Sequence, residues 1–217
     1  MSWISRLKSS LGSKNVDVEQ KTVDVASIHY TMPTVAFDAL TFVVPTQASI
    51  EGAPQFHEDE WCQIELLPAA SLKELQTTLA EYKIFEKAHR LQYGWSQIFA
   101  RRLARTALIE GTDAVGKLAG LFGATPSNAP ILTTTSKPLG QVENGFAVKP
   151  SSDVLLYGLV DERGITALGA MVQGDDRQLS QVFAKLHSSF GFMLVDWRQQ
   201  LALCSVGPDG NFAVWRP

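Results

Sequence analysis

Four carboxylic acids come closest to a catalytic set in this sequence. They lie near the ends of segments with strand-like composition, and they are Asp153, Asp161, Glu162 and Asp196. Two carboxylates that meet across a substrate serve as general acid and general base, as in glycoside hydrolysis, and such a pair has no local motif. The four acids therefore define one alternative, a hydrolase-like enzyme whose carboxylates converge only in the fold.

The tripeptide Asp196-Trp197-Arg198 adds to this alternative an acid, an aromatic platform and a guanidinium at one strand end. The simpler interpretation is an aspartate that faces a turn beside a half-buried tryptophan. The sequence favours the simpler interpretation, because aspartate is common at turns.

Two groups of opposite charge predict recognition of another macromolecule. The acidic group lies in the Gly- and Pro-containing segment 47–60 and comprises Glu51, Glu58, Asp59 and Glu60. The basic group comprises Arg101 and Arg105, which are four residues apart, with Arg102 beside them and Arg90 further upstream. Guanidinium groups bind phosphates and carboxylates with two parallel hydrogen bonds. The same arginines can instead form a solvated face or pair with acids of this chain, such as Glu58 to Glu60, and the sequence leaves these options open.

Other site chemistries lack the spacing that they need. The histidines have no metal-ligand spacing to one another or to a cysteine, and they are His29, His57, His89 and His187. We therefore expect no metal and no cofactor. Neither a GxSxG elbow nor a Cys–His signature is present, and both cysteines, Cys62 and Cys204, fall in apolar contexts typical of buried thiols. The Gly116-Lys117 pair lacks the upstream glycine and the Ser or Thr of a P-loop.

Composition excludes several classes of protein. The 217 residues are 45% hydrophobic and carry a net charge of −3. This balance excludes a disordered chain and argues against a dedicated nucleic-acid binder, which usually has a basic face. Two cysteines do not make a disulfide framework. No secretory signal or membrane-spanning run is evident, so we expect a soluble, cytoplasmic protein.

The N-terminal segment carries an amphipathic pattern. An apolar stripe at helical spacing comprises Trp3, Ile4, Leu7 and Leu11, and Arg6, Lys8 and Lys14 lie off that stripe. A basic amphipathic helix fits an anionic membrane or the groove of a partner. The sequence favours a helix docked on its own domain or a segment without structure, because three helical turns with three cations bind a membrane weakly. Membrane association is therefore a second alternative.

The elements that must position these residues follow from local patterns. We expect strands at 22–30, 35–44 and 61–67, a loop at 47–60, and a helix over 72–91 that begins with a capping box of Ser71 and Glu74. Two more helices are predicted over 95–110 and from Thr112-Asp113 to 122. An irregular strand is predicted at 146–148. The last third predicts a hairpin of 154–160 and 165–172 with Gly164 at a positive φ, a helix from Asp175 or Asp176 to 188, and strands at 192–197, 201–206 and 212–215.

These patterns predict an α+β fold, with one or more antiparallel β-sheets packed with two to three main α-helices. The expected organisation is an N-terminal segment (1–21), an α+β subdomain (22–122), a linker or irregular region (123–150) and a second α+β subdomain (151–217). The function that we expect is a non-enzymatic, inhibitor- or immunity-like module that binds a protein partner, because no local catalytic signature is present. Its acidic loop would enter a basic cleft, and such binding weakens as salt rises.

Overall fold

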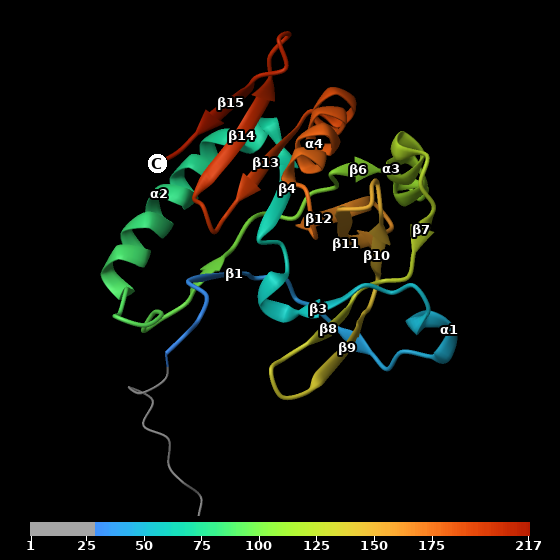
Figure 1. Cartoon of the computed structure of the whole chain (residues 1–217), viewed down its shortest axis with the longest axis horizontal. Coiled ribbons are helices and arrows are strands. Elements are labelled where there is room, and N and C mark those ends of the chain that lie inside the picture. Colours follow the sequence, from blue (N-terminus) through green and yellow to red (C-terminus); the bar gives the residue numbers. More distant parts are fainter. Residues whose placement is uncertain (1–28) are drawn as a thin grey trace, which may run out of the picture.

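A nine-stranded antiparallel sheet forms the centre of the computed structural model, which describes residues 29–217 (Figure 1). Its strands run in the order β15 (Phe212–Trp215), β14 (Leu201–Val206), β13 (Phe192–Asp196), β4 (Ile64–Pro68), β12 (Gly164–Val172), β11 (Val154–Asp161), β10 (Gly145–Val148) and β7 (Pro126–Ser127), and β6 (Ile109–Glu110) pairs with β12 outside this path. The predicted α+β class with antiparallel strands is confirmed for this part of the chain.

Two smaller sheets flank the central one. β1 (Thr34–Ala36) pairs in parallel with β5 (Phe99–Arg101). The four-stranded sheet has the order β2 (Phe42–Val43), β9 (Pro138–Val142), β8 (Ile131–Thr133) and β3 (Gln55–His57). The helices of the described residues are α1 (Gln47–Ile50), α2 (Leu72–His89), α3 (Ala114–Phe122) and α4 (Asp176–Phe190), with short 3₁₀ turns η3 (Glu58–Glu60) and η4 (Ala69–Ser71). Residues 29–217 thus have four helices rather than two to three, and strands predominate.

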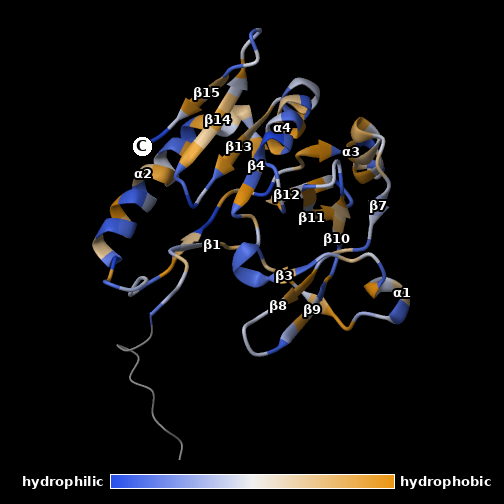
Figure 2. Cartoon of the chain, in the orientation of Figure 1, coloured by the Kyte–Doolittle hydropathy of each residue, from blue (hydrophilic) through white to orange (hydrophobic). Residues whose placement is uncertain are grey.

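The core divides into three clusters, because both faces of the central sheet are covered. α3 and α4 cover one face, where α4 buries Val182, Phe183 and Leu186 against strand residues such as Leu194. α2 covers part of the other face, and the four-stranded sheet covers the rest. Both α2 and α4 carry hydrophilic and hydrophobic residues along their length, as expected of helices with one face on a sheet (Figure 2).

The predicted helix over 72–91 is confirmed as α2, with Leu75, Leu79 and Tyr82 buried at helical spacing against the sheet. Its predicted capping box is wrong, because the Ser71 side chain makes no capping hydrogen bond. Ser71 has φ −83° and ψ 7° at the end of η4, whereas an N-cap residue needs an extended backbone. The 3₁₀ turn therefore leads directly into the helix.

The last third of the chain matches its prediction. The β11–β12 hairpin pairs Asp161 with Gly164, whose φ is +133°. A Cβ on Gly164 would lie 2.0 Å from the carbonyl oxygen of Ile109, so the approach of β6 also requires glycine here. Asp175 caps α4 by accepting a hydrogen bond from the amide of Arg177, and β10 and the three C-terminal strands form where the patterns place them.

The predicted helix over 95–110 is wrong. The strands in this segment are β5 and β6, and the residues between them have no regular secondary structure. The Arg101 side chain donates to the carbonyl of Cys62 and to the hydroxyl of Thr34, and β5 pairs with β1. These long-range hydrogen bonds override a helical spacing of apolar residues that is only a local preference.

The segment before β4 also differs from its prediction. The single strand expected over 35–44 is divided into β1 and β2, and the loop expected over 47–60 contains α1, β3 and η3. Thr46 caps α1 through reciprocal hydrogen bonds with Ser49. The strand predicted from residue 22 and the N-terminal amphipathic stripe lie outside the described residues, except that Tyr30 forms a β-bridge with Trp95.

β4 connects the two predicted subdomains in one sheet. It belongs to the predicted 22–122 subdomain, yet it lies between β12 and β13 of the predicted 151–217 subdomain. β10, from the predicted 123–150 linker, pairs with β11 in the same sheet. Within residues 29–217, no helix combines the length and the hydropathy needed to cross a bilayer.

Candidate functional site

A cleft of about 370 Å³ opens where the strands on either side of β4 separate from it. β12 pairs with β4 over only two residue pairs, Gly169 with Glu65 and Ala170 with Ile64, and β13 ends where Asp196 pairs with Ile64. The residues that line the cleft come from η3, the residue before β4, β4, β12, the end of β13 and the β13–β14 turn, and they are Glu60, Gln63, Ile64, Ala170, Met171, Val172, Asp196, Arg198 and Gln199.

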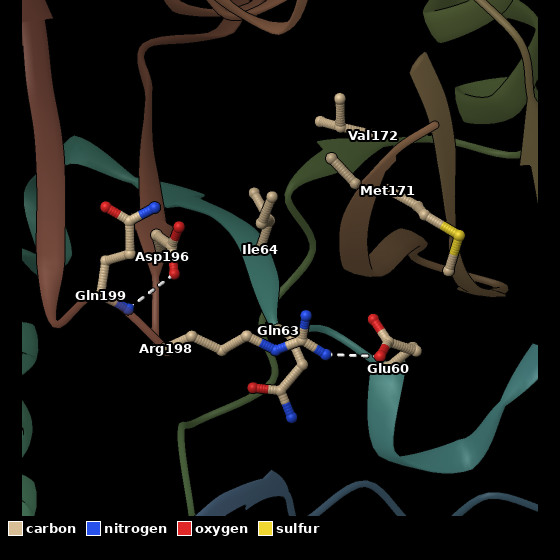
Figure 3. Close-up of a pocket in the computed structure, with 9 residues that line it drawn as sticks. Glu60, Gln63, Ile64, Met171, Val172, Asp196, Arg198 and Gln199 are labelled. Atoms are coloured by element: carbon tan, nitrogen blue, oxygen red, sulfur yellow. Dashed lines mark hydrogen bonds and ion pairs between the residues drawn. The ribbon is translucent and has the colours of Figure 1, made fainter. Parts of the chain in front are cut away.

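Three charged side chains lie at the mouth of this cleft (Figure 3). Arg198 extends from the β13–β14 turn towards η3, where its Nη2 donates to Oε1 of Glu60 at 2.5 Å. The Asp196 carboxylate accepts a hydrogen bond from the backbone amide of Gln199 at 2.9 Å, and this bond fixes the turn that carries Arg198. One guanidinium and two carboxylates, from segments far apart in sequence, therefore share one opening.

The wall of the cleft is apolar. Ile64, Met171 and Val172 are partly buried, and in Figure 3 they lie above the Arg198–Glu60 contact. A pocket with apolar walls and a few convergent polar groups is the usual form of a binding site. The cleft can thus hold the aliphatic part of a charged side chain while the charge remains at its mouth.

A buried ion network lies beside the cleft and supports β4. Glu65 follows the cleft residue Ile64, and its side chain is 1% exposed. Its carboxylate accepts from Arg105 at 2.5 Å and from the Trp197 indole at 2.9 Å. Arg105 also donates to both oxygens of Asp38, at 2.7 and 2.9 Å, and Asp38 accepts from the Trp61 indole. Burial lowers the pKa of the Arg105 guanidinium, but Glu65 and Asp38 outweigh this effect and raise that pKa.

Arg101 is a second buried cation in this network. Its guanidinium carbon lies 4.7 Å from the centre of the Trp197 ring, and its residue is 2% exposed. Burial lowers the pKa of this guanidinium, although the nearby Glu65 carboxylate opposes that effect. The Arg101 contacts join β1, β5 and the chain before β4, so this residue has a structural role.

The four candidate catalytic carboxylates do not converge. Asp153 accepts from the Asp175 amide and from Gln178 at the start of α4. Asp161 and Glu162 are exposed at the far end of β11, where hydrogen bonds from the Arg163 side chain lower the pKa of Asp161. Asp196 lines the cleft, and its companion there is Glu60. Of the four acids proposed for a carboxylate enzyme, only Asp196 therefore lines this cleft.

Three of the four acids predicted for partner binding lie in η3, which contributes Glu60 to the cleft, whereas Glu51 directly follows α1. Glu51 and Glu58 are exposed. Asp59 is partly buried 3.4 Å from a ring nitrogen of His57, and Glu60 is paired with Arg198. Glu58 and Glu60 flank Asp59 in η3, so this turn presents acids beside the cleft mouth.

The arginines predicted for partner binding separate into different environments. Arg101 and Arg105 point into the protein, where Arg105 pairs with acids of its own chain. These acids are Asp38 and Glu65 rather than the acids of the 47–60 segment. Arg102 is exposed and lies over the Phe37 ring at 4.4 Å. The three arginines therefore do not form one surface, since Arg101 and Arg105 are directed into the protein and Arg102 is exposed.

The sequence does not mark Asp38, Glu65 or Trp61 as site residues, and it marks Arg198 only as the guanidinium of the Asp196-Trp197-Arg198 tripeptide. The alternating pattern of 61–67 places Gln63 and Glu65 on the polar, outward face of a half-buried strand. Both are buried in the structure, at 3% and 0% exposure, because β4 is covered on both faces. No local signal distinguishes such a strand from an edge strand.

The described residues offer little for nucleophilic or metal chemistry. Cys62 is buried, and burial followed by the charges of Glu65 and Asp38 raises the pKa of its thiol. Burial also raises the pKa of Cys204. No group of three or more metal-ligating side chains occurs among residues 29–217.

The chain matches no known family model, no curated protein and no solved structure. A functional assignment therefore depends on the geometry of the cleft and on the surface around it.

Proposed function

We propose that this chain is a non-enzymatic binding protein that receives a basic side chain of a protein partner at the cleft mouth. The receiving groups are Glu58, Glu60 and Asp196. The observation that carries the proposal is the contact between Glu60 and Arg198, in which a cleft carboxylate already accepts a guanidinium. A partner arginine or lysine would add to this arrangement or replace Arg198 in it.

The position of the acids supports binding. Glu58 is exposed at the start of η3, and Asp196 lies across the opening at the end of β13. Arg198 is itself exposed, so exchange of its contact with Glu60 requires no change in the core. Charged groups at the rim of an interface mainly set association rate and specificity.

The lining of the cleft favours binding over catalysis. Its titratable residues are Glu60, Asp196 and Arg198, and none of its nine described lining residues is a Ser, Cys, His or Lys. A general acid or base must also be able to reach a reacting proton. Here Glu60 is engaged by Arg198, and Asp196 holds its own turn through the Gln199 amide. An inhibitor-like role follows if the partner contributes the basic residue from its own active site.

The test is affinity capture with the immobilised full chain, followed by measurement of Kd for each captured protein. The test variant is Glu58→Lys combined with Asp196→Asn, because asparagine retains the side-chain oxygen that accepts from Gln199. The matched control is Glu81→Lys, which changes an exposed acid on α2. We expect a partner that binds the wild type and the control. We expect the test variant to bind this partner at least about tenfold more weakly, with further weakening as salt rises.

Two results would overturn the proposal. One is a partner that binds the Glu58→Lys/Asp196→Asn variant as tightly as the wild type. The other is binding that does not change with salt, since surface charge pairs are screened by ions.

A further inference from the structure

We propose that the C-terminal end of α2 and the loop that follows it form a binding surface for an anionic lipid bilayer. This surface, the α2-end surface, comprises Lys83, Ile84, Lys87, Arg90 and Tyr93. It shares no lining residue with the acidic cleft, and its charge is opposite.

Three cations of the α2-end surface lie on one side of the helix. Lys83, Lys87 and Arg90 follow at i, i+4 and i+7, and they line an open depression of about 460 Å³ together with Glu86 and Gln200. All three cationic residues are exposed. A row of cations along a helix face is the arrangement that juxtamembrane and interfacial helices present to anionic headgroups.

The acid within this depression is already engaged. The carboxylate of Glu86 accepts a hydrogen bond from Gln200 and lies 3.9 Å from Arg90. The Lys83 ammonium donates to the Pro217 carbonyl oxygen. No described residue forms a hydrogen bond or ion pair with the Lys87 ammonium. Lys87 and the exposed side of Arg90 thus remain for anionic ligands.

Two bulky side chains next to these cations are exposed to water. Ile84 is 72% exposed, and Tyr93 is 77% exposed. Ile84 lies one helical turn before Lys87, and Tyr93 lies in the loop directly after the helix. One exposed apolar residue needs no explanation, but an aliphatic and an aromatic side chain beside a row of cations match an interfacial surface. Tyrosine suits this position because its ring is apolar and its hydroxyl remains hydrated.

The loop that carries Tyr93 has a defined shape. Tyr30 and Trp95 exchange two backbone hydrogen bonds, at 2.9 and 3.0 Å, and the Arg90 guanidinium lies 4.4 Å from the centre of the Trp95 ring. Gly94 has φ +81°, and a Cβ there would lie 2.3 Å from the Tyr30 carbonyl oxygen. The surface is therefore held in place before any ligand binds, which reduces the entropy lost on binding.

The same backbone pairing connects this surface to the N-terminal sequence. Because Tyr30 is paired to Trp95, the described chain begins beside the loop after α2 (Figure 1). The preceding residues carry in sequence the apolar stripe of Trp3, Ile4, Leu7 and Leu11 with basic residues off that stripe. Two basic and apolar groups joined by a short stretch of chain would reinforce each other on one membrane, since the second binding event is intramolecular.

The test is flotation of the full-length protein with phosphatidylcholine vesicles that contain or lack phosphatidylserine. The charge variant is Lys87→Glu, and the apolar variant is Ile84→Ser combined with Tyr93→Ser, which leaves the net charge unchanged. The matched control is Lys149→Glu, an equal charge reversal at an exposed position after β10. Circular dichroism of each variant checks that the fold is retained.

We expect wild type and control to bind only the phosphatidylserine vesicles. The charge variant and the apolar variant should each bind at least about fivefold more weakly, and salt should weaken wild-type binding. Equal binding to both kinds of vesicle, no binding to either, or equal loss in Lys149→Glu would overturn the proposal. The proposal would also be overturned if both surface variants bind the vesicles as well as the wild type and only substitution of Trp3 and Leu7 abolishes binding. The N-terminal segment alone would then bind the membrane. Competition by inorganic phosphate beyond that of chloride at equal ionic strength would indicate a phosphate site instead of a bilayer surface.

Discussion

Glu65 shows how this protein accommodates a charge in its core. Its carboxylate is almost completely buried, and it accepts from Arg105 on one oxygen and from the Trp197 indole on the other. Arg105 in turn is shared with Asp38. Each acid in this network therefore has a charged or indole donor, which is the condition under which a buried charge can be tolerated.

Replacement of one member should therefore be strongly destabilising. Glu65→Gln removes the negative charge that compensates Arg105 while it keeps the size of the side chain, and we expect the free energy of unfolding to fall by about 3 kcal/mol. The control is Glu60→Gln, because the Glu60–Arg198 pair is 38% and 42% exposed and such a pair contributes less than about 1 kcal/mol. Urea unfolding measures both changes. Equal losses in the two variants would contradict a structural role for the network.

The buried phenol and thiol beside this network predict loss of stability in alkali. The Tyr157 hydroxyl accepts from the Cys62 amide and donates to the Glu60 carbonyl, and burial raises the pKa of both side chains above their ordinary values of 10.0 and 9.0. The folded protein then keeps protons that the unfolded chain releases. The contribution of these two groups to the free energy of unfolding should be constant below about pH 8 and should be lost as pH rises through about 9 to 11 and above.

Urea midpoints between pH 7 and pH 11 measure this effect. Tyr157→Phe should be less stable at neutral pH by about 1–3 kcal/mol, because the Cys62 amide and Glu60 carbonyl lose their partner. Its stability should also fall less steeply above pH 10, since one titrating group is gone. A wild type whose stability does not change up to pH 11 would show that these groups titrate normally.

The residues of the network and the cleft were largely beyond prediction from the sequence. Asp196 was identified as a candidate acid and Glu60 as a candidate partner residue, because charge and position near a strand end are local features. Alternation along 61–67 indicates a half-buried strand with Glu65 on its polar face, and it does not reveal that both faces of this strand are covered. A pairing such as Arg105 with Asp38 joins residues that only the tertiary fold brings together.

Among the elements, the segments with strong local signals were predicted correctly. α2 and α4 each have apolar residues at helical spacing, and α4 also has its Asp175 cap. The β11–β12 hairpin has two apolar strands and a glycine at its turn. The segment 95–110 also has a helical spacing of apolar residues, yet it forms the short strands β5 and β6 and no helix. Its hydrogen-bond partners Pro33, Thr34 and Cys62 come from distant parts of the chain. Local patterns therefore fail where β pairing is long-range.

Two glycines provide a test of packing within these elements. A Cβ on Gly158 in β11 would lie 1.8 Å from the backbone carbonyl oxygen of Ala167 on β12, whereas a Cβ on Gly120 in α3 meets nothing within 4 Å. Gly158→Ala should therefore destabilise the protein by at least about 2 kcal/mol through strain in the central hairpin. Gly120→Ala should stabilise it by about 0.5–1 kcal/mol, because alanine favours the helix. Thermal unfolding of both variants measures the difference, and a stable Gly158→Ala protein would mean that β11 and β12 can move apart.

For the whole molecule, strand order was the property that the sequence did not reveal. The strands from β11 onward mostly pair with neighbours in sequence, as hairpins do. β4 does not, since it is inserted between β12 and β13 about one hundred residues before them in the chain. The amino-acid sequence of β4 does not indicate which strands pair with it. A domain boundary near residues 123–150 is therefore expected from the Gly- and Pro-rich composition there.

The position of β4 predicts that the two predicted subdomains do not fold separately. A fragment of residues 22–122 would lack both strands that pair with β4, and its α2 would lose contacts with Met193, Val195 and Trp197. A fragment of residues 151–217 would retain its hairpins but expose the apolar face that α2 and Leu67 cover. We expect neither fragment to unfold cooperatively in urea, whereas the full chain should show a single transition. A cooperative transition of the 151–217 fragment would show that its own core suffices and that β4 is added to a domain that is already stable.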